Sequence, residues 1–225
     1  MFVNIIKQNP LKGHKFKKEK MKQLVLATAT AAFIFTSCGG GGESKKQEEK
    51  PEASMSAETM DVAVDGKVQW EGTLVGVYSH YGTVNVSEGN VKMNGNKVVG
   101  GSFTIDMTTI TPEDDNYKPE EGSTPEKLVS HLSSEDFFSV EEYPTATFVI
   151  TGSSEDGKTL MGDLTVRGVT NPEKVENLMI DADKGTMTGT MVVDRKKYDV
   201  TWDHPLQEMV LNDDMQFEIT LMKKS

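Results

Sequence analysis

Hydrophobic and polar residues alternate with a period of two along several stretches of the chain from residue 67 onward. In the first stretch, Val68, Trp70, Leu74 and Tyr78 fall on one face, while Lys67, Gln69, Glu71 and Thr73 fall on the other. Such alternation is typical of β-strands with one buried and one solvated face. The pattern recurs around residues 102–108, 145–151, 160–167, 186–193 and 215–221.

Turn signals separate these stretches. Asn94-Gly95, Asp156-Gly157 and Lys184-Gly185 are typical of short antiparallel connections. With weaker candidates at 81–93 and 174–182, the pattern predicts about eight strands. Closure of such a sheet would remove its exposed edges, so we expect an all-β, eight-stranded antiparallel barrel. A barrel of this size is just wide enough to hold one small ligand in place of a filled core.

Two long connections, 108–144 and 195–212, interrupt the series. The first contains "STPEKLVSHL", in which Thr124 can cap a helix, Pro125 suits the first helical position, and Leu128 and Leu132 lie one turn apart. This predicts a short helix within a long loop. Loops this long in a compact domain are usually functional.

Composition places the folded region in one part of the chain. The 225 residues are enough for one domain with appendages, and both the hydrophobic fraction of 36% and the mean hydropathy of −0.44 are low. Residues 1–37 contain seven lysines and one glutamate, a net charge of +6. Since the whole chain carries −11, residues 38–225 carry a net charge of −17. A region this acidic repels phosphate backbones, which argues against nucleic acid as a partner.

The basic end resembles an export signal. Met21-Lys22 precedes the apolar run 24–35, which is too short to span a bilayer, and we expect Met21 to be the start with residues 1–20 upstream. The run ends in "FTSC", similar to the signal of bacterial lipoproteins, in which Cys38 would take a diacylglyceryl group. The alternative is ordinary cleavage that leaves a free thiol, which would be unusual in an oxidising compartment.

Residues 38–60 are rich in Gly, Ser, Glu and Lys, which predicts a flexible tether. We therefore divide the chain into an upstream extension and signal (1–37), a tether (38–60) and a barrel domain (61–225). The expected location is the bacterial cell envelope, on a membrane through the lipid anchor and facing the periplasm or the cell surface.

Several motifs resemble those of a known family. The stretch "SHLSSEDFFSVEEYPTATFVI", with "GGSFTIDMTTI" before it and "GDLTVRGVT" after it, is similar to the YceI-like family of polyisoprenoid-binding, lipocalin-like proteins. The likeness covers roughly Gly66 to Asp199. It implies a barrel whose apolar interior holds an isoprenoid chain, such as a quinone tail or a polyprenyl lipid. Two positions depart from the family pattern: one extra residue precedes Gly82, and Asp199 replaces a usual glycine.

Candidate ligand-binding residues are apolar side chains of the interior and of one mouth. Phe137 and Phe138 follow the predicted helix, so one of them should point into the mouth as part of a lid; alternatively, both simply seal an ordinary core. The methionines at 107, 161, 179, 187, 191 and 215 would suit an adaptable interior. The full set of expected site residues is Trp70, Leu74, Phe103, Ile105, Phe137, Phe138, Phe148, Leu164, Met191 and Phe217.

Catalysis has weaker support. His80, His131 and His204 lack metal-ligand spacing, and no nucleophile elbow, phosphate loop or dinucleotide motif is present. We expect the protein to have no enzymatic activity, no cofactor and no metal. An enzymatic function would require that His80, His131 and Glu135 converge at one mouth of the barrel. Arg195 can meet a carboxylate or a ligand head group, and a structural ion pair is the simpler interpretation.

Two functions remain. The first is a lipid-anchored carrier for an isoprenoid chain, and the alternative is a structural or stress-protective envelope module with a filled barrel. One buried isoprene unit contributes roughly 3–4 kcal/mol, against association costs on the order of 4–15 kcal/mol, so several units must enter together. The sequence leaves open which isoprenoid binds and whether two copies form a homodimer.

Overall fold

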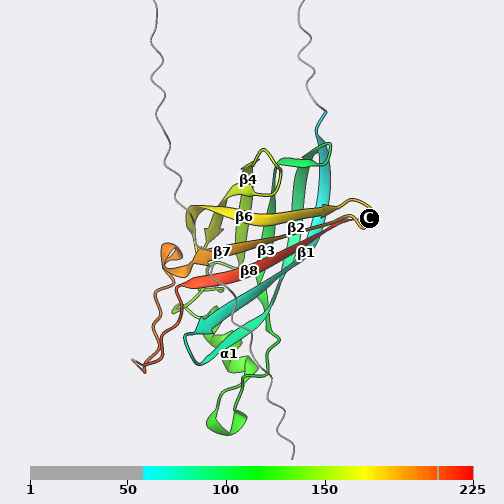
Figure 1. The fold of residues 1–225 in the computed structure, drawn as a ribbon. Helices are drawn as coiled ribbons and strands as arrows, with labels where there is room; N and C mark the ends of the chain where they lie inside the picture. The colour runs from blue at the N-terminus through cyan, green and yellow to red at the C-terminus, as the bar shows by residue number, and fades with distance from the viewer. Residues whose placement is uncertain (1–57, 207, 225) are drawn as a thin grey trace, which may run out of the picture. The chain divides into compact units, whose positions relative to one another are not determined.

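A closed antiparallel β-barrel forms the domain. The computed structural model describes residues 58–206 and 208–224. Each strand pairs with the next in the chain, and the last pairs with the first (Figure 1). The strands are β1 (Met60–Leu74), β2 (Tyr78–Asn94), β3 (Lys97–Pro112), β4 (Thr145–Ser153), β5 (Leu160–Val166), β6 (Val169–Asp181), β7 (Thr186–Asp194) and β8 (Asp214–Lys223). The predicted eight-stranded barrel is therefore confirmed.

The predicted turns and helix are present. Gly95, Gly157 and Gly185 all have positive φ, between 59° and 70°, which a residue without Cβ adopts at little cost. Helix α1 (Pro125–Ser133) begins as expected, with the Thr124 hydroxyl accepting a hydrogen bond from the Lys127 N–H. Figure 1 shows α1 at one end of the barrel. Two short 3-10 helices, η1 (Pro119–Glu121) and η2 (Arg195–Tyr198), complete the structure.

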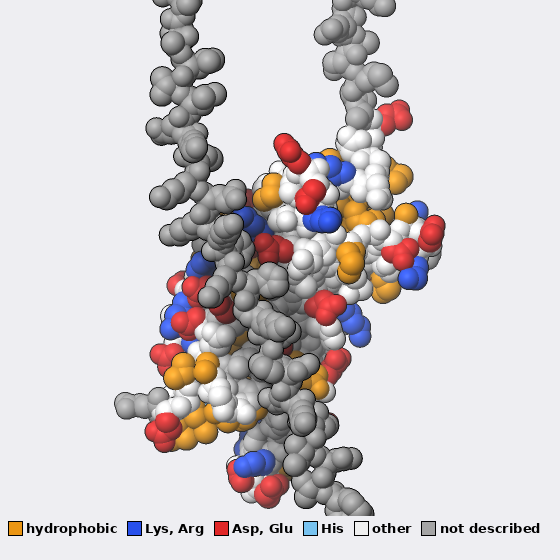
Figure 2. Space-filling model, in the orientation of Figure 1, with side chains coloured by type: hydrophobic (Ala, Val, Ile, Leu, Met, Phe, Trp, Pro, Cys, Tyr) orange, Lys and Arg blue, Asp and Glu red, His pale blue; other side chains and the backbone are white. Residues whose placement is uncertain are grey.

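Strand β6 is longer than the pattern predicts. It starts at Val169, and only Val175 and Leu178 of its side chains are fully buried. Its apolar periodicity is therefore weak, although its backbone pairs with both neighbours. Lysines, arginines and acidic residues are interspersed over the visible outer face of the barrel (Figure 2).

The predictions about the export signal, Cys38 and most of the tether concern residues 1–57, which lie outside the described part of the chain. Within residues 58–206 and 208–224, no helix has the length and apolar character needed to cross a membrane.

Candidate ligand-binding site

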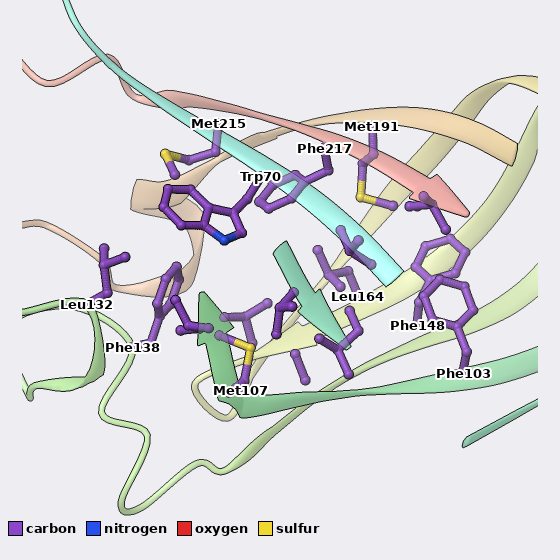
Figure 3. A pocket seen from close by; sticks show the side chains of 17 residues that line it. Trp70, Phe103, Met107, Leu132, Phe138, Phe148, Leu164, Met191, Met215 and Phe217 are labelled. Carbon is purple, nitrogen blue, oxygen red and sulfur yellow. The ribbon is translucent and has the colours of Figure 1, made fainter. Parts of the chain in front are cut away.

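A cavity inside the barrel is lined only by hydrophobic side chains. Its volume is about 90 Å³, and seven strands, α1 and the segment after α1 contribute to it (Figure 3). The lining residues are Val68, Trp70, Val84, Phe103, Ile105, Met107, Ile110, Leu132, Phe138, Ala146, Phe148, Leu164, Val166, Met191, Met215, Phe217 and Ile219. We call this space the main cavity.

Strand register brings the largest of these side chains together. Trp70 of β1 lies opposite Phe217 of β8, which in turn lies opposite Met191 of β7. On the other side of the barrel, Phe148 of β4 pairs with Phe103 of β3, and their ring centroids are 5.4 Å apart. The lining is thus built by cross-strand neighbours rather than by sequence neighbours.

One half of the barrel is filled. Beyond Phe103 only about 10 Å³ of free space remains, enclosed by side chains such as Ile150, Leu160, Val175 and Leu221. Figure 3 shows Phe103 and Phe148 at one end of the main cavity, with Trp70, Leu132, Phe138 and Met215 toward the other end. Free space therefore lies toward α1, and the opposite half is an ordinary packed core.

The two adjacent phenylalanines separate in role. Phe138 lines the main cavity, whereas Phe137 is 3% exposed and packs beneath α1. The Phe138 N–H donates to the Leu132 carbonyl at 3.0 Å, so the chain folds back onto the end of the helix. The rings meet edge to face, with centroids 4.8 Å apart. Of the two rings, Phe138 therefore points into the barrel interior, and Phe137 lines the pocket described next.

A second pocket adjoins the main cavity. We call it the mouth pocket; its volume is about 200 Å³, and it shares Trp70, Leu132 and Met215 with the main cavity. Its remaining lining residues are Gly72, Leu74, Tyr78, His80, Leu128, His131, Phe137, Trp202, His204 and Leu211. The apolar main cavity thus lies next to a pocket with aromatic and histidine side chains.

His131 has an unusual environment in the mouth pocket. Its Nε2 is buried and has no hydrogen-bond partner. The indole of Trp202 lies edge to face against the imidazole at 4.6 Å, and Phe137 does so at 5.6 Å. Burial lowers the pKa of His131, and the nearby Asp136 carboxylate opposes this shift only partly. The imidazole is therefore neutral at pH 7.

His80 belongs to a hydrogen-bonded cluster around a buried carboxylate. Its Nδ1 lies 3.0 and 3.1 Å from the two oxygens of Asp114, which also accept from Asn116 N–H, Tyr81 N–H and the Tyr117 hydroxyl. Burial alone would raise the pKa of Asp114, but these donors hold it below its usual value. Burial and then Asp114 raise the pKa of Tyr117. Asp114 is thus a buried, fully bonded anion.

Both arginines bind backbone carbonyls. Arg195 is 3% exposed and donates to the carbonyls of Val200, Trp202 and Asn212, with Asp203 and Asp213 as ionic partners. Arg167 donates to the carbonyls of Phe137 and Asp199 at 2.7 and 3.2 Å. Arg195 therefore has the structural role that the sequence offered as the simpler interpretation.

Comparison with known proteins decides the family. A model described as the YceI-like domain matches residues 55–222. The chain belongs to the YceI-like family. Members of this family are known as polyisoprenoid-binding barrel proteins, and the family is one of binding proteins rather than enzymes.

Individual relatives are more distant. A UPF0312 protein of Staphylococcus aureus strain USA300 is 32% identical over 120 residues, which covers 49% of this chain and slightly less than two thirds (66%) of the relative. Burkholderia cenocepacia BcnA is 20% identical, with a TM-score of 0.48 over 69% of this chain and 94% of that one. A Campylobacter jejuni YceI protein is 18% identical, with a TM-score of 0.37 over 57% and 75%.

The structure shows the surroundings of Gly82 and Asp199, the two positions near which this chain departs from the family pattern. Gly82 lies opposite Trp70, and a Cβ there would sit 2.7 Å from the indole and 2.1 Å from the Thr111 carbonyl. The indole Nε1 donates to the Thr83 carbonyl, which holds the ring across the strand. Asp199 has φ 58°, in the left-handed region that glycine adopts at lower cost than other residues.

Of the ten expected site residues, eight line the main cavity, and Leu74 and Phe137 line the mouth pocket instead. Of the six methionines, Met107, Met191 and Met215 line the main cavity and Met187 borders the small space beyond Phe103. Met161 is partly buried and lines neither space, and Met179 is 68% exposed. The structure brings His80, His131 and His204 to one pocket, but not Glu135. Among the described residues, no His, Cys, Asp and Glu side chains form a group able to hold a metal ion.

Sequence reasoning missed Asp114, Tyr117 and Leu132 as neighbours of the site. Asp114 is bonded by residues 33 and 34 positions earlier in the chain, so no local signal reveals its burial. The sequence places Leu132 on the predicted helix, one turn after Leu128. This spacing could have indicated which face of the helix turns toward the barrel.

The rim beside the mouth pocket exposes apolar side chains. Val75 and Val77 of the β1–β2 turn and Val210 are each more than half exposed, and Leu206 is 50% exposed. The Val75 N–H donates to the Val210 carbonyl at 2.8 Å, which joins the turn to the loop before β8. Figure 2 shows hydrophobic side chains gathered at this end of the barrel, at the lower left.

Proposed function

We propose that this protein is a non-enzymatic carrier that holds an isoprenoid chain in the barrel and is attached to a membrane of the bacterial cell envelope through Cys38. The observation that carries the proposal is the main cavity, whose seventeen lining side chains are all apolar. Such a lining offers a hydrocarbon chain about 0.8 kcal/mol per buried CH₂ and offers a polar metabolite no hydrogen bonds.

The apolar rim supports a carrier. A chain that moves from a lipid phase into the barrel must pass the mouth, and contact with Val75, Val77 and Val210 would reduce its exposure to water on the way. The three methionines of the main cavity have flexible thioethers, which can adapt to a mobile ligand.

The small size of the main cavity favours the alternative function, an envelope module with a filled barrel. Its 90 Å³ is smaller than the about 300–1,000 Å³ typical of ligand pockets, and the half beyond Phe103 is filled. An envelope module that needs no ligand would have such an interior. The carrier instead requires that Phe138, Met107 and Met215 move apart when the chain enters.

Native mass spectrometry can separate the two functions. The full chain carrying Cys38→Ser, which cannot be lipidated, would be produced in a quinone-containing bacterium and its bound lipids extracted. A stoichiometric adduct identified as an isoprenoid supports the carrier. A mass that equals the bare chain, and does not change when isoprenoids are added, would reject it and leave the envelope module.

A further inference from the structure

We propose that the mouth pocket binds the head group of the isoprenoid, and that it selects a neutral quinone or quinol ring over a phosphorylated head. This inference rests on the proposed carrier function and goes further, because it names the chemistry of the ligand's polar end. It follows from the shared lining of the two spaces, from the charges around the mouth pocket and from the buried Nε2 of His131, which has no hydrogen-bond partner.

The shared lining of the two spaces assigns tail and head. Trp70, Leu132 and Met215 line both the main cavity and the mouth pocket. The main cavity offers no polar atom, and its far end is packed closed at Phe103 and Phe148. A chain that enters past Trp70, Leu132 and Met215 would therefore place its apolar end in the main cavity and leave its polar end in the mouth pocket.

The charges around the mouth pocket disfavour phosphate. Its lining contains no lysine and no arginine. The only two arginines of the chain already donate to backbone carbonyls. The buried Asp114 carboxylate lies directly behind His80 and would repel a phosphorylated head. A diphosphate would thus lose its hydration without gaining a cation.

The shape and polarity of the mouth pocket suit a flat ring with one or two oxygens. The side chains of Trp70, Tyr78, Phe137 and Trp202 present aromatic surfaces to it. The unpartnered Nε2 belongs to a neutral imidazole, which can donate to a quinone carbonyl in one tautomer and accept from a quinol hydroxyl in the other. Trp202 lies against this imidazole, so the ring would have to displace the indole to reach Nε2.

The test compares three ligands with the same fifteen-carbon tail: a farnesyl-substituted benzoquinone, farnesyl diphosphate and farnesene. Binding to the full chain carrying Cys38→Ser is measured by isothermal titration calorimetry. We expect the quinone to bind about tenfold tighter than farnesene, since one neutral hydrogen bond alone gives roughly 2- to 10-fold and the ring adds contacts. Farnesyl diphosphate should bind more weakly than the quinone.

Variants assign the effect to His131. His131→Phe should weaken quinone binding by about 3- to 10-fold while farnesene affinity changes little, and His131→Gln, which keeps a hydrogen-bonding group, should restore part of the loss. Ser130→Phe places the same new ring at the neighbouring, exposed position and should change none of the three affinities.

Two results would overturn the inference while leaving the carrier intact: equal affinity for all three ligands, or tighter binding of the diphosphate. A quinone preference that His131→Phe does not reduce would also reject the role of His131. If none of the three ligands binds, the carrier function itself is wrong, and the head-group inference is rejected with it.

Discussion

The guanidinium of Arg195 donates a hydrogen bond of 2.7 Å to the backbone carbonyl of Trp202. Through this bond, and others to Val200 and Asn212, one buried side chain at the end of β7 fixes the loop that carries the indole of the mouth pocket. The ionic partners Asp203 and Asp213 are 78% and 45% exposed in their side chains, so they neutralise the charge from the solvent side.

Arg195→Met should lower the free energy of unfolding by about 2–4 kcal/mol. The substitution leaves several carbonyls without their donor, and each unsatisfied buried group costs about 1–3 kcal/mol. Urea unfolding would measure the loss. Lys197→Met is the matched control: its ion pair with Glu173 is half exposed at the lysine end and contributes at most about 1 kcal/mol. Equal stability of the two variants would show that Arg195 does not hold the loop.

Gly82→Ala should displace Trp70. A Cβ at this position would lie 2.1 Å from the Thr111 carbonyl and 2.7 Å from the indole, so either β3 or the ring must move. We expect a loss of about 1–3 kcal/mol, the range for overpacking, and a shift of tryptophan fluorescence as the indole loses its bond to Thr83. Gly76→Ala tests for a general effect of removing a glycine, because a Cβ there meets no atom within 4 Å, although its φ of 74° carries a backbone cost. Unchanged fluorescence in Gly82→Ala would contradict the contact.

Asp199→Gly should stabilise the barrel. Asp199 has φ 58° and ψ 21°, a conformation that costs non-glycine residues roughly 1 kcal/mol. Its carbonyl bond to Arg167 involves only the backbone and survives the change. We expect a gain of up to about 1 kcal/mol, and a loss of about 1–2 kcal/mol for Asp199→Val, because β-branched residues tolerate this region least. A thermal melt in which valine matched glycine would reject the backbone explanation.

Strand residues of the site were predictable, since a period of two places alternate side chains inside any barrel wall. Trp70, Phe103, Phe148 and Phe217 therefore line the main cavity as expected. The mouth pocket was not predictable, because its shape depends on contacts between distant segments. Trp202 is positioned by Arg195, and Asp114 by donors from β2.

The volume of the interior also escapes sequence reasoning. The same alternation that supplies Phe103 to the main cavity supplies Ile150, Leu160 and Val175 to the filled half. Whether apolar side chains leave space or interlock depends on their rotamers across all strands, and the hydrophobic pattern does not encode this.

Acidification should destabilise the barrel through His131. Its pKa is lowered by burial from the model-compound value of 6.5, so below pH 6.5 the unfolded chain takes up a proton that the folded chain does not. The contribution of His131 to the free energy of unfolding is therefore constant above pH 6.5. It falls as the pH drops below 6.5, until the pH passes the pKa of His131 in the folded protein. His131→Phe should remove this component. The free energy of unfolding would be measured at several pH values between 7 and 5, and it should depend less steeply on pH in His131→Phe. An equal pH dependence in both proteins would contradict the burial of a neutral imidazole.

Phe103 should limit the length of the bound chain. Phe103 packs against Phe148, and of these two rings Phe103 borders both the main cavity and the 10 Å³ space beyond it. Phe103→Leu would remove part of this wall and join the two spaces, at a cost of roughly 1–3 kcal/mol for the cavity created. If the isoprenoid tail lies in the main cavity, the variant should gain affinity for longer chains relative to short ones. Ile150→Val enlarges the filled half without opening the wall and should leave the preference unchanged. Titration with a series of polyprenyl quinones of increasing length would measure how affinity depends on chain length. An unchanged length preference in Phe103→Leu would place the end of the tail elsewhere.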